Sequence, residues 1–130
     1  MLRSHNEVRR QAGVRPLAWS DRLTAQAQDW ANTLLASGKF AHRPHSATGE
    51  NLFEIRGASA TPAEVVAAWA AEASDYDYGS NLCHGMCGHY TQLIWKTTKE
   101  VGCAVAKSGN REVWVCEYAP PGNYIGQRPY

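Results

Sequence analysis

The sequence has 130 residues, of which 44% are hydrophobic and 19% are charged, as expected for one globular domain spanning residues 1–130. Its formal net charge is +1 and its basic residues are scattered, so it lacks the basic surface that nucleic acid or an anionic membrane requires. No apolar run approaches the roughly 18 residues of a membrane-spanning helix. We therefore expect neither a nucleic-acid partner nor a membrane span.

Two helices are predicted in the first third of the chain. Ser4-x-x-Glu7 has the spacing of a capping box, and Gly13 would end the short helix that it begins. A second helix is predicted between Ser20, a typical N-cap, and Gly38, a typical stop. Its apolar residues recur with helical spacing: Leu23, Ala27, Trp30, Ala31 and Leu34.

The middle of the chain is less regular. Residues 39–60 show little periodicity and predict a long loop, of the kind that often carries function. Thr61-Pro62-Ala63-Glu64 predicts the start of a third helix, because a capping box coincides with proline at the first helical position. Residues 75–87 are polar and rich in tyrosine, and a short helix with one polar and one apolar side is predicted after them, within 88–95.

A β-hairpin is predicted near the C-terminal end. The strand-like segments 101–107 and 112–119 flank Gly109-Asn110, a two-residue turn signal. With this turn at the centre, Cys103 lies directly opposite Cys116. Both faces of the hairpin are largely apolar, so each should be covered by another layer. Since helices precede the hairpin, we expect a helix–sheet–helix sandwich.

The four cysteines predict two disulfides. Opposed residues on antiparallel strands have Cα atoms about 4.5–5.5 Å apart, within disulfide range, which pairs Cys103 with Cys116 and leaves Cys83 with Cys87. Two disulfides indicate an oxidising compartment. The alternative is a closed zinc site formed by Cys83, Cys87 and His89, with His84 as a further ligand, since Cys-x3-Cys falls within the spacing of zinc sites.

His89 is the first candidate site residue. On the predicted short helix it shares a face with Gln92, while Tyr90 and residues 93–95 supply apolar surroundings. A histidine in such a frame is either a satisfied core residue or part of a site, and this segment alone does not decide between the two.

Three further polar residues are candidates. Glu72 falls on the apolar stripe of the third helix, where a carboxylate needs a partner unless it reaches solvent at the helix end. Glu50 and His42 lie in the long loop, and His45 could take the place of His42. No local metal-binding motif is present. If these residues converge, the imidazoles would suit Zn²⁺ or a similar divalent ion, with the carboxylates as ligands, orienting groups or bases.

Motifs along nearly the whole chain resemble the CAP superfamily, which comprises cysteine-rich secretory proteins, antigen 5 and pathogenesis-related class 1 proteins. One family signature matches residues 88–95, and the other matches residues 116–124. Shorter matches occur in the family's order: His5-Asn6 with Arg9, Pro16-Leu17-x-Trp19, Gly49-Glu50-Asn51-Leu52 and Trp69-x-x-Glu72.

The resemblance implies an α+β fold, a three-layer α-β-α sandwich with an antiparallel central sheet and a large open cleft. It implies that the cleft holds a tetrad of four residues: His42, Glu50, Glu72 and His89. Within this tetrad, His42 and His89 can coordinate a divalent metal, and zinc is the metal that we expect. Gln92 and Tyr90 would support the cleft. The cysteine pairs resemble two of the three disulfides of plant members, and both cysteines of the third plant pair are missing here.

Two departures limit what the resemblance implies. Arg43 follows the cleft histidine where plant members often have serine, so serine-assisted proteolysis is not implied. Residues 120–130 resemble a signalling peptide that plant members release after an aspartate, but Ala119 stands in place of that aspartate.

The leading functional prediction is a secreted, non-enzymatic protein that binds a sterol or another small lipid, in defence or host interaction, with an extracellular protein as a further partner. Trp69, Tyr76 and Tyr78 resemble the aromatic segment associated with sterol binding in fungal members, and ordinary packing is the alternative role for them. Met1-Leu2-Arg3 leads straight into a polar helix, so we expect a mature extracellular domain whose signal peptide has been removed.

Two alternative functions remain at this point. One is a zinc-dependent hydrolase, a peptidase, in which Glu50 or Glu72 acts as the base. The other is a purely structural role, in which the tetrad is a hydrogen-bonded network that holds the cleft.

Overall fold

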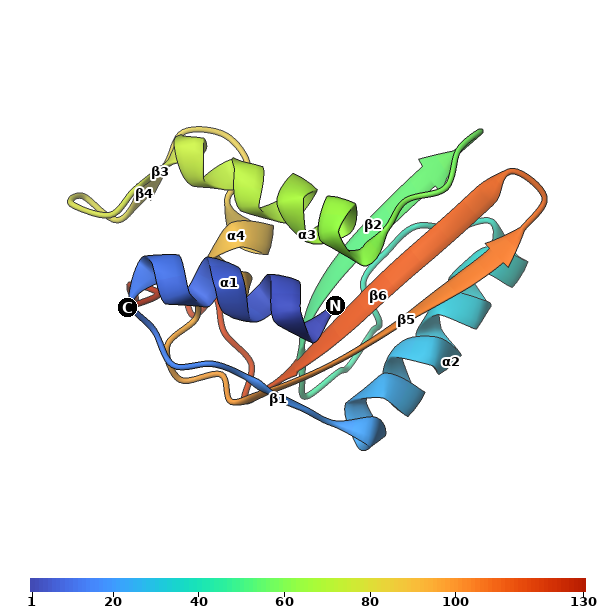
Figure 1. Ribbon diagram of the computed structural model, residues 1–130, viewed down its shortest axis with the longest axis horizontal. Coiled ribbons are helices and arrows are strands. Elements are labelled where there is room, and N and C mark those ends of the chain that lie inside the picture. Colours follow the sequence, from blue (N-terminus) through green and yellow to red (C-terminus); the bar gives the residue numbers. More distant parts are fainter.

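A four-stranded sheet separates two layers of helices in the computed structural model, which describes residues 1–130 (Figure 1). The helices are α1 (Leu2–Ala12), α2 (Asp21–Ser37), α3 (Pro62–Ala70), the 3₁₀-helix η1 (Ala71–Asp75) and α4 (Gly88–Leu93). The main sheet contains β1 (Ala18–Trp19), β5 (Glu100–Ser108), β6 (Arg111–Ala119) and β2 (Gly49–Arg56), in that order. A separate small hairpin pairs β3 (Tyr76–Asp77) with β4 (Leu82–Cys83).

The predicted hairpin forms with the predicted register. β5 and β6 pair antiparallel with Ser108 opposite Arg111 and Cys103 opposite Cys116. β2 adds to the other edge of β6, also antiparallel, and β1 adds two residues in parallel to β5. The sheet is therefore mixed, and the short β1–β5 pair is its one departure from the antiparallel sheet that we predicted. Strand β1 has only two residues, which is too few to produce a periodic pattern in the sequence.

Both faces of the hairpin are covered, as its two apolar faces predicted. α2 covers one face, while α1, α3 and α4 lie on the other (Figure 1). The core under α2 consists of Ala27, Ala31, Leu34, Leu52, Ala106, Val113 and Val115. The larger core on the opposite face consists of Leu17, Val65, Val66, Trp69, Leu93, Ile94, Val101, Cys103, Trp114, Cys116 and Tyr118. The α-β-α sandwich is thus confirmed.

The ends of α2 and α3 agree with the sequence signals. The Ser20 side chain accepts a hydrogen bond from the Leu23 N–H at 3.1 Å, and Gly38 ends α2 in the left-handed conformation. Thr61 and Glu64 form the predicted capping box of α3. α3 ends at Ala70, and the chain continues as η1, so Glu72 projects from a tighter 3₁₀ turn.

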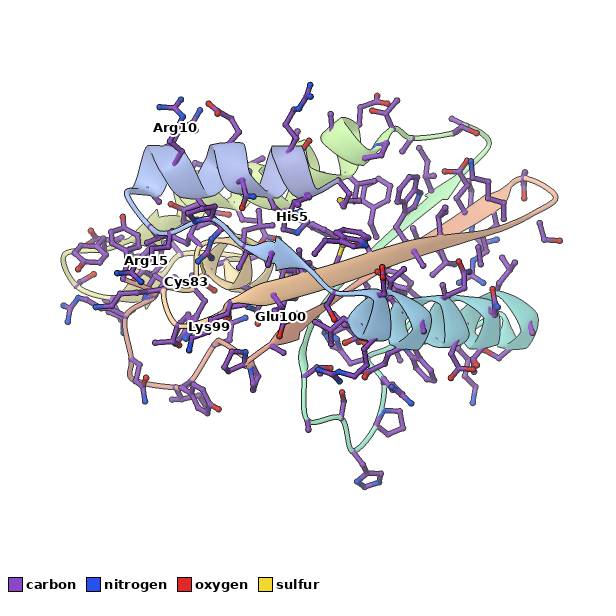
Figure 2. The ribbon with its side chains drawn as sticks, turned by 60° about the horizontal axis from the view of Figure 1, so that its bottom comes forward. His5, Arg10, Arg15, Cys83, Lys99 and Glu100 are labelled. Carbon is purple, nitrogen blue, oxygen red and sulfur yellow. A yellow bond between two sulfur atoms is a disulfide. The ribbon has the colours of Figure 1, made fainter.

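Helix α1 begins earlier than predicted. Its N-cap is Met1, and Ser4 lies inside the helix, so the predicted capping box does not form. Met1 and Leu2 pack against the larger core, which favours extension of the helix toward the N-terminus. Figure 2 shows His5 on the side of α1 that faces the sheet and Arg10 on the opposite side.

The predicted loop 39–60 contains a strand that the sequence pattern did not reveal. Residues 49–56 form β2, in which Glu50 lies opposite Glu117 and Asn51 opposite Cys116. Asn51 and Leu52 are both buried although they are neighbours, so the alternation typical of a half-buried strand is lost. The segment 75–87, predicted as irregular, likewise contains the short β3–β4 hairpin.

Both predicted disulfides form. Cys83 and Cys87 have Cα atoms 6.0 Å apart, and Cys103 and Cys116 have Cα atoms 4.1 Å apart. No cysteine is free. The closed zinc–thiolate site was therefore a wrong alternative, because both of its sulfur ligands are bonded to each other. None of the helices is both long enough and apolar enough to cross a membrane.

Candidate functional site

Two histidine–glutamate pairs lie beside one open cavity of about 470 Å³, which we call the histidine cleft. His42, Glu50 and His89 line it directly, together with Asn51 and the Cys83–Cys87 disulfide. Glu72 does not line the cavity but is bonded to the His89 ring. Of the alternatives His42 and His45, it is His42 that lines the cleft.

His89 is held by hydrogen bonds and by stacking. Its Nδ1 lies 2.6 Å from Glu72 Oε2, while Glu72 Oε1 accepts hydrogen bonds from the His89 and Tyr90 N–H groups at 2.9 and 3.2 Å. The Trp69 ring stacks on the His89 ring with centroids 6.1 Å apart and an interplanar angle of 13°. The Trp69 indole N–H donates to the Leu52 carbonyl at 3.0 Å. Each of these contacts fixes the orientation of the imidazole.

Buried polar residues connect His89 to the sheet. Asn51 on β2 donates through Nδ2 to the His89 carbonyl at 3.1 Å and to the Tyr118 hydroxyl at 3.2 Å. Gln92, on α4, is buried and bonds to the Gly122 N–H and the Thr98 hydroxyl. It therefore braces the segments around α4. Tyr90 packs half-buried against the larger core.

His42 is held more loosely. Its Nδ1 lies 2.7 Å from Glu50 Oε1, which also accepts a hydrogen bond from the Arg43 N–H at 3.1 Å. The hydrogen bond to Glu50 raises the pKa of His42. The His42 side chain is 68% exposed, against 25% for His89. Trp30 on α2 donates to the Ala41 carbonyl at 3.0 Å and so ties the adjacent loop to the helix.

Glu117 is a site residue that we did not predict. It lies opposite Glu50 in the β2–β6 pair, is fully buried, and accepts a hydrogen bond from the Thr48 hydroxyl at 2.8 Å. Outside the pair of Glu50 and Glu117, no residue donates a hydrogen bond to Glu117 Oε1 or to Glu50 Oε2. Burial, and then the neighbouring Glu50 carboxylate, raise the pKa of Glu117 to about 9. Burial alone would raise the pKa of Glu50, but hydrogen bonds from His42, Glu117 and the Arg43 N–H lower it.

Of this pair of buried carboxyl groups, Glu117 therefore keeps a proton at neutral pH, because two adjacent carboxylates do not both ionise in such surroundings. The sequence carried a signal for this pair. Val113 and Val115 point to one face of β6, and the next residue of that series is Glu117. An acidic residue in an otherwise buried series indicates a carboxyl group that must find a partner.

Comparison with known proteins agrees with this architecture. The family model described as the cysteine-rich secretory protein family, CAP, matches residues 2–118. The chain belongs to the CAP family. It is 44% identical to the basic form of pathogenesis-related protein 1 of Nicotiana tabacum, over 99% of this chain and 73% of that protein. It is 38% identical to pathogenesis-related protein 1 of Arabidopsis thaliana, over 99% and 80% of the two chains.

Solved structures share the fold. The venom allergen-like protein 4 of Schistosoma mansoni superposes with a TM-score of 0.83 at 26% identity, covering 99% of this chain and 90% of that chain. A crystal structure of NaASP2 with Zn²⁺ superposes with a TM-score of 0.81, covering 99% and 82% of the two chains. At 24% identity the second likeness concerns the fold alone.

The hydrogen bonds of the two cleft histidines of this CAP chain leave one nitrogen of each ring available to a ligand. Each Nδ1 is bonded to a carboxylate, and neither Nε2 has a partner in the protein. A carboxylate on the second ring nitrogen is the usual way in which a metal-binding imidazole is oriented. The tetrad is open, since no three of its ligand atoms lie within 4.8 Å of one another, so water or a bound ligand would complete the coordination. His5, Cys103 and Cys116 do lie that close together, but both sulfurs belong to a disulfide.

The three aromatic residues predicted for lipid binding do not gather around the cleft. Trp69 is buried in the larger core. The Tyr76 hydroxyl donates to the Asn81 side chain at 2.7 Å, and its ring lines a different cavity. Tyr78 stacks on Tyr130 with ring centroids 4.5 Å apart. For Trp69, the structure therefore shows a packing role, in the larger core and against the His89 ring.

Proposed function

We propose that this CAP protein is a secreted, defence-related protein that acts by binding rather than by catalysis. Its histidine cleft would hold a divalent metal ion on His42 and His89, and zinc is the ion that we propose. A small lipid of the sterol class would bind beside the ion. The names of the plant relatives support the defence role, since they are pathogenesis-related proteins. The observation that carries the metal-binding part is that both histidines line one cavity and have an unbonded Nε2, while a glutamate holds each Nδ1.

An apolar rim beside the histidines supports the lipid part of the proposal. Met86 lines the cleft and is 64% exposed, and the Cys83–Cys87 disulfide forms the adjacent wall. Leu82, which directly precedes this wall, is 56% exposed. Exposed apolar side chains at the edge of a cavity favour an apolar ligand, and a lipid hydroxyl would reach the imidazoles or their metal.

The hydrolase alternative has less support. Glu72 uses both carboxylate oxygens on His89 and Tyr90 and does not line the cleft. The Glu50 side chain is only 5% exposed and is shared between His42, the Arg43 N–H and Glu117. A general base must reach the proton that it removes, whereas Glu72 is fully bonded away from the cleft and the Glu50 carboxylate is almost entirely buried. Comparing peptide hydrolysis by the wild type and Glu72→Gln in the presence of Zn²⁺ keeps this alternative open to test.

Titration calorimetry with Zn²⁺ tests the metal-binding part. We expect the wild type to bind one ion and His89→Ala to bind it at least about tenfold more weakly, because a ligand is lost. His84→Ala is the matched control, since His84 is an exposed histidine that does not line the cleft. Equal zinc affinity in the two variants would rule out the site.

A labelled-sterol titration, with and without Zn²⁺, tests the lipid part. We expect saturable binding by the wild type and weaker binding by Met86→Gln, which makes the apolar rim polar. Ile125→Gln is the control, because Ile125 is a fully exposed apolar residue that does not line the cleft. Absence of saturable sterol binding would remove the lipid part and leave the metal-binding part standing.

A further inference from the structure

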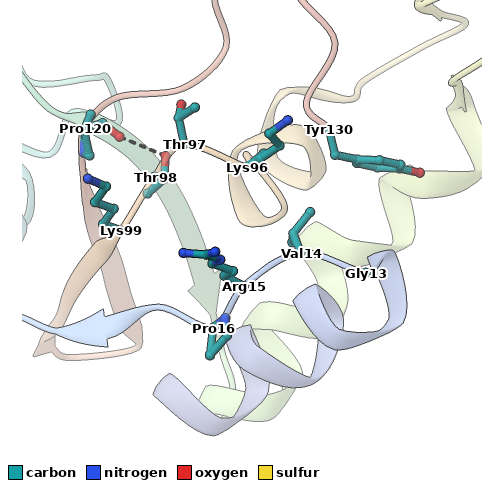
Figure 3. A pocket seen from close by; sticks show the side chains of 10 residues that line it. All are labelled: Gly13, Val14, Arg15, Pro16, Lys96, Thr97, Thr98, Lys99, Pro120 and Tyr130. Atoms are coloured by element: carbon teal, nitrogen blue, oxygen red, sulfur yellow. Dashed lines mark hydrogen bonds between the residues drawn. The ribbon is translucent and has the colours of Figure 1, made fainter.

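A second cavity lies away from the tetrad residues. Its volume of about 900 Å³ is nearly twice the volume of the histidine cleft. Residues 13–16, which follow α1, form one wall, and residues 96–99, which precede β5, form the other (Figure 3). Pro120 and Tyr130 complete the lining. We call this cavity the basic pocket. Its volume is within the range of sites for small molecules.

The charged side chains on the basic pocket are all of one sign. Arg15, Lys96 and Lys99 line it, and no aspartate or glutamate does. None of the three cations forms an ion pair anywhere in the chain. In Figure 3 the Arg15 side chain reaches from its own wall toward the segment 96–99. A protein with a formal net charge of +1 thus has three cationic side chains at one concave site, and none of them forms an ion pair.

A fourth cation lies directly behind the walls of the pocket. Arg9 is fully buried, and its guanidinium donates to the Arg15 carbonyl at 2.6 Å and to the Thr98 carbonyl at 3.3 Å. Its other bonds go to the Leu93 and Trp95 carbonyls at 2.9 and 3.0 Å, and no carboxylate pairs with it. Arg9 therefore holds both walls in place while its charge adds to the positive potential between them.

The pocket also has an apolar part. Val14 and Tyr130 are half-buried against the larger core, and Pro16 and Pro120 add apolar surface to the same lining. The Tyr130 carbonyl is bonded to the Tyr78 hydroxyl at 2.6 Å. A ligand that fits this lining needs an anionic group for the cations and an apolar body for the valine, prolines and tyrosine.

We propose that the basic pocket binds an amphiphile that carries a phosphate or sulfate group, with the anion on Arg15, Lys96 and Lys99. Arginine bonds such oxyanions through two parallel N–H groups, and lysine adds mobile point charges. The pocket shares no lining residue with the histidine cleft, so this proposal does not rest on the function proposed for that cleft.

Titration calorimetry with octyl phosphate and octyl sulfate, below their micelle concentrations, tests the proposal. We expect one saturable site in the wild type and binding about tenfold weaker in the variant Arg15→Ala, Lys96→Ala, Lys99→Ala. Binding should also weaken as salt is added, because exposed charges are screened. Octanol and inorganic phosphate, which each lack one half of the ligand, should both bind more weakly than octyl phosphate.

The matched control is the variant Arg22→Ala, Lys39→Ala, Arg56→Ala, which removes the same charge from exposed positions outside the pocket. It should bind octyl phosphate as the wild type does, and so should His89→Ala, whose change lies in the other cavity. The single variant Lys99→Ala serves if the triple variant loses its circular dichroism spectrum. Equal loss in both triple variants, or octanol binding as tight as octyl phosphate binding, would overturn the proposal.

Discussion

The two halves of the histidine cleft hold their imidazoles by different means. His89 lies on a helix, stacks on a buried tryptophan and bonds to a glutamate that accepts three hydrogen bonds. His42 lies on a loop, is mostly exposed, and bonds to Glu50, whose buried neighbour is a second carboxyl group, Glu117. The first half is preformed, whereas the second can adjust its position and its protonation.

This difference assigns separate tasks to the two halves. A fixed imidazole sets where a metal or ligand binds, because little orientation entropy remains to be lost. An exposed imidazole on a loop can close on that ligand afterwards. The carboxyl pair behind His42 also places the pH-sensitive part of the site on the adjustable side.

The largest expected effect comes from the proton held by Glu117. Its folded-state pKa is raised to about 9 from the ordinary glutamate value of 4.5, so between these values the folded chain keeps a proton that the unfolded chain releases. The stabilisation is complete below pH 4.5 and is lost as the pH rises toward 9. We expect the free energy of unfolding to fall with a slope of up to about 1.4 kcal/mol per pH unit over this window.

Glu117→Gln should flatten this slope, since an amide can donate to Glu50 and accept from Thr48 without a titrating proton. Urea denaturation at a series of pH values measures it. Glu100→Gln, at an exposed position on β5, should keep the wild-type slope. A Glu117→Gln variant with an unchanged slope would show that the proton is held elsewhere.

The second prediction compares the two glutamates directly. Glu72→Ala leaves the His89 ring and two backbone N–H groups without their acceptor in partly buried surroundings, so it should cost about 2–4 kcal/mol of unfolding free energy. Glu50→Ala should cost less than about 1 kcal/mol, because the exposed His42 ring and the Arg43 N–H can bond to water instead. Urea denaturation at neutral pH gives both values. Equal costs would contradict the distinction between the preformed and adjustable halves.

The sequence predicted the parts of the fold that depend on local signals. Ser20, Thr61 and Gly109-Asn110 each act over a few residues, and they correctly located α2, α3 and the hairpin register that pairs Cys103 with Cys116. β2 was missed because its burial depends on residues that are distant in the sequence. Asn51 can be buried because His89 and Tyr118 supply its hydrogen-bond partners.

The residues that make up the tetrad could be named from the sequence, but their pairing in space could not. The family resemblance supplied the four tetrad residues, and the pattern placed His89 on a short helix. Which glutamate pairs with which histidine depends on how η1 meets α4, a contact that no local spacing encodes. Glu117 was missed because it matters only through Glu50, its neighbour across two strands that lie 67 residues apart in the chain.

The smallest expected effect compares two tryptophans, one in each half of the cleft. Trp69 donates to the Leu52 carbonyl in the core, whereas Trp30 donates to the Ala41 carbonyl at an exposed position. Replacing either by phenylalanine keeps an aromatic ring and removes the N–H donor. We expect Trp69→Phe to cost about 1–2 kcal/mol, since a buried carbonyl loses its partner, and Trp30→Phe to cost less than about 0.5 kcal/mol, since water replaces the bond.

The zinc titration separates the two variants a second time. Trp69→Phe should also weaken zinc binding, because the ring stacked on His89 is smaller and no longer fixed by a hydrogen bond. Trp30→Phe should leave the zinc affinity nearly unchanged, because the His42 side chain is 68% exposed and is held by Glu50 rather than by the Trp30 indole. If Trp30→Phe weakens zinc binding as much as Trp69→Phe, the His42 loop is as rigid as the α4 frame. The two halves of the cleft would then act as one preformed site.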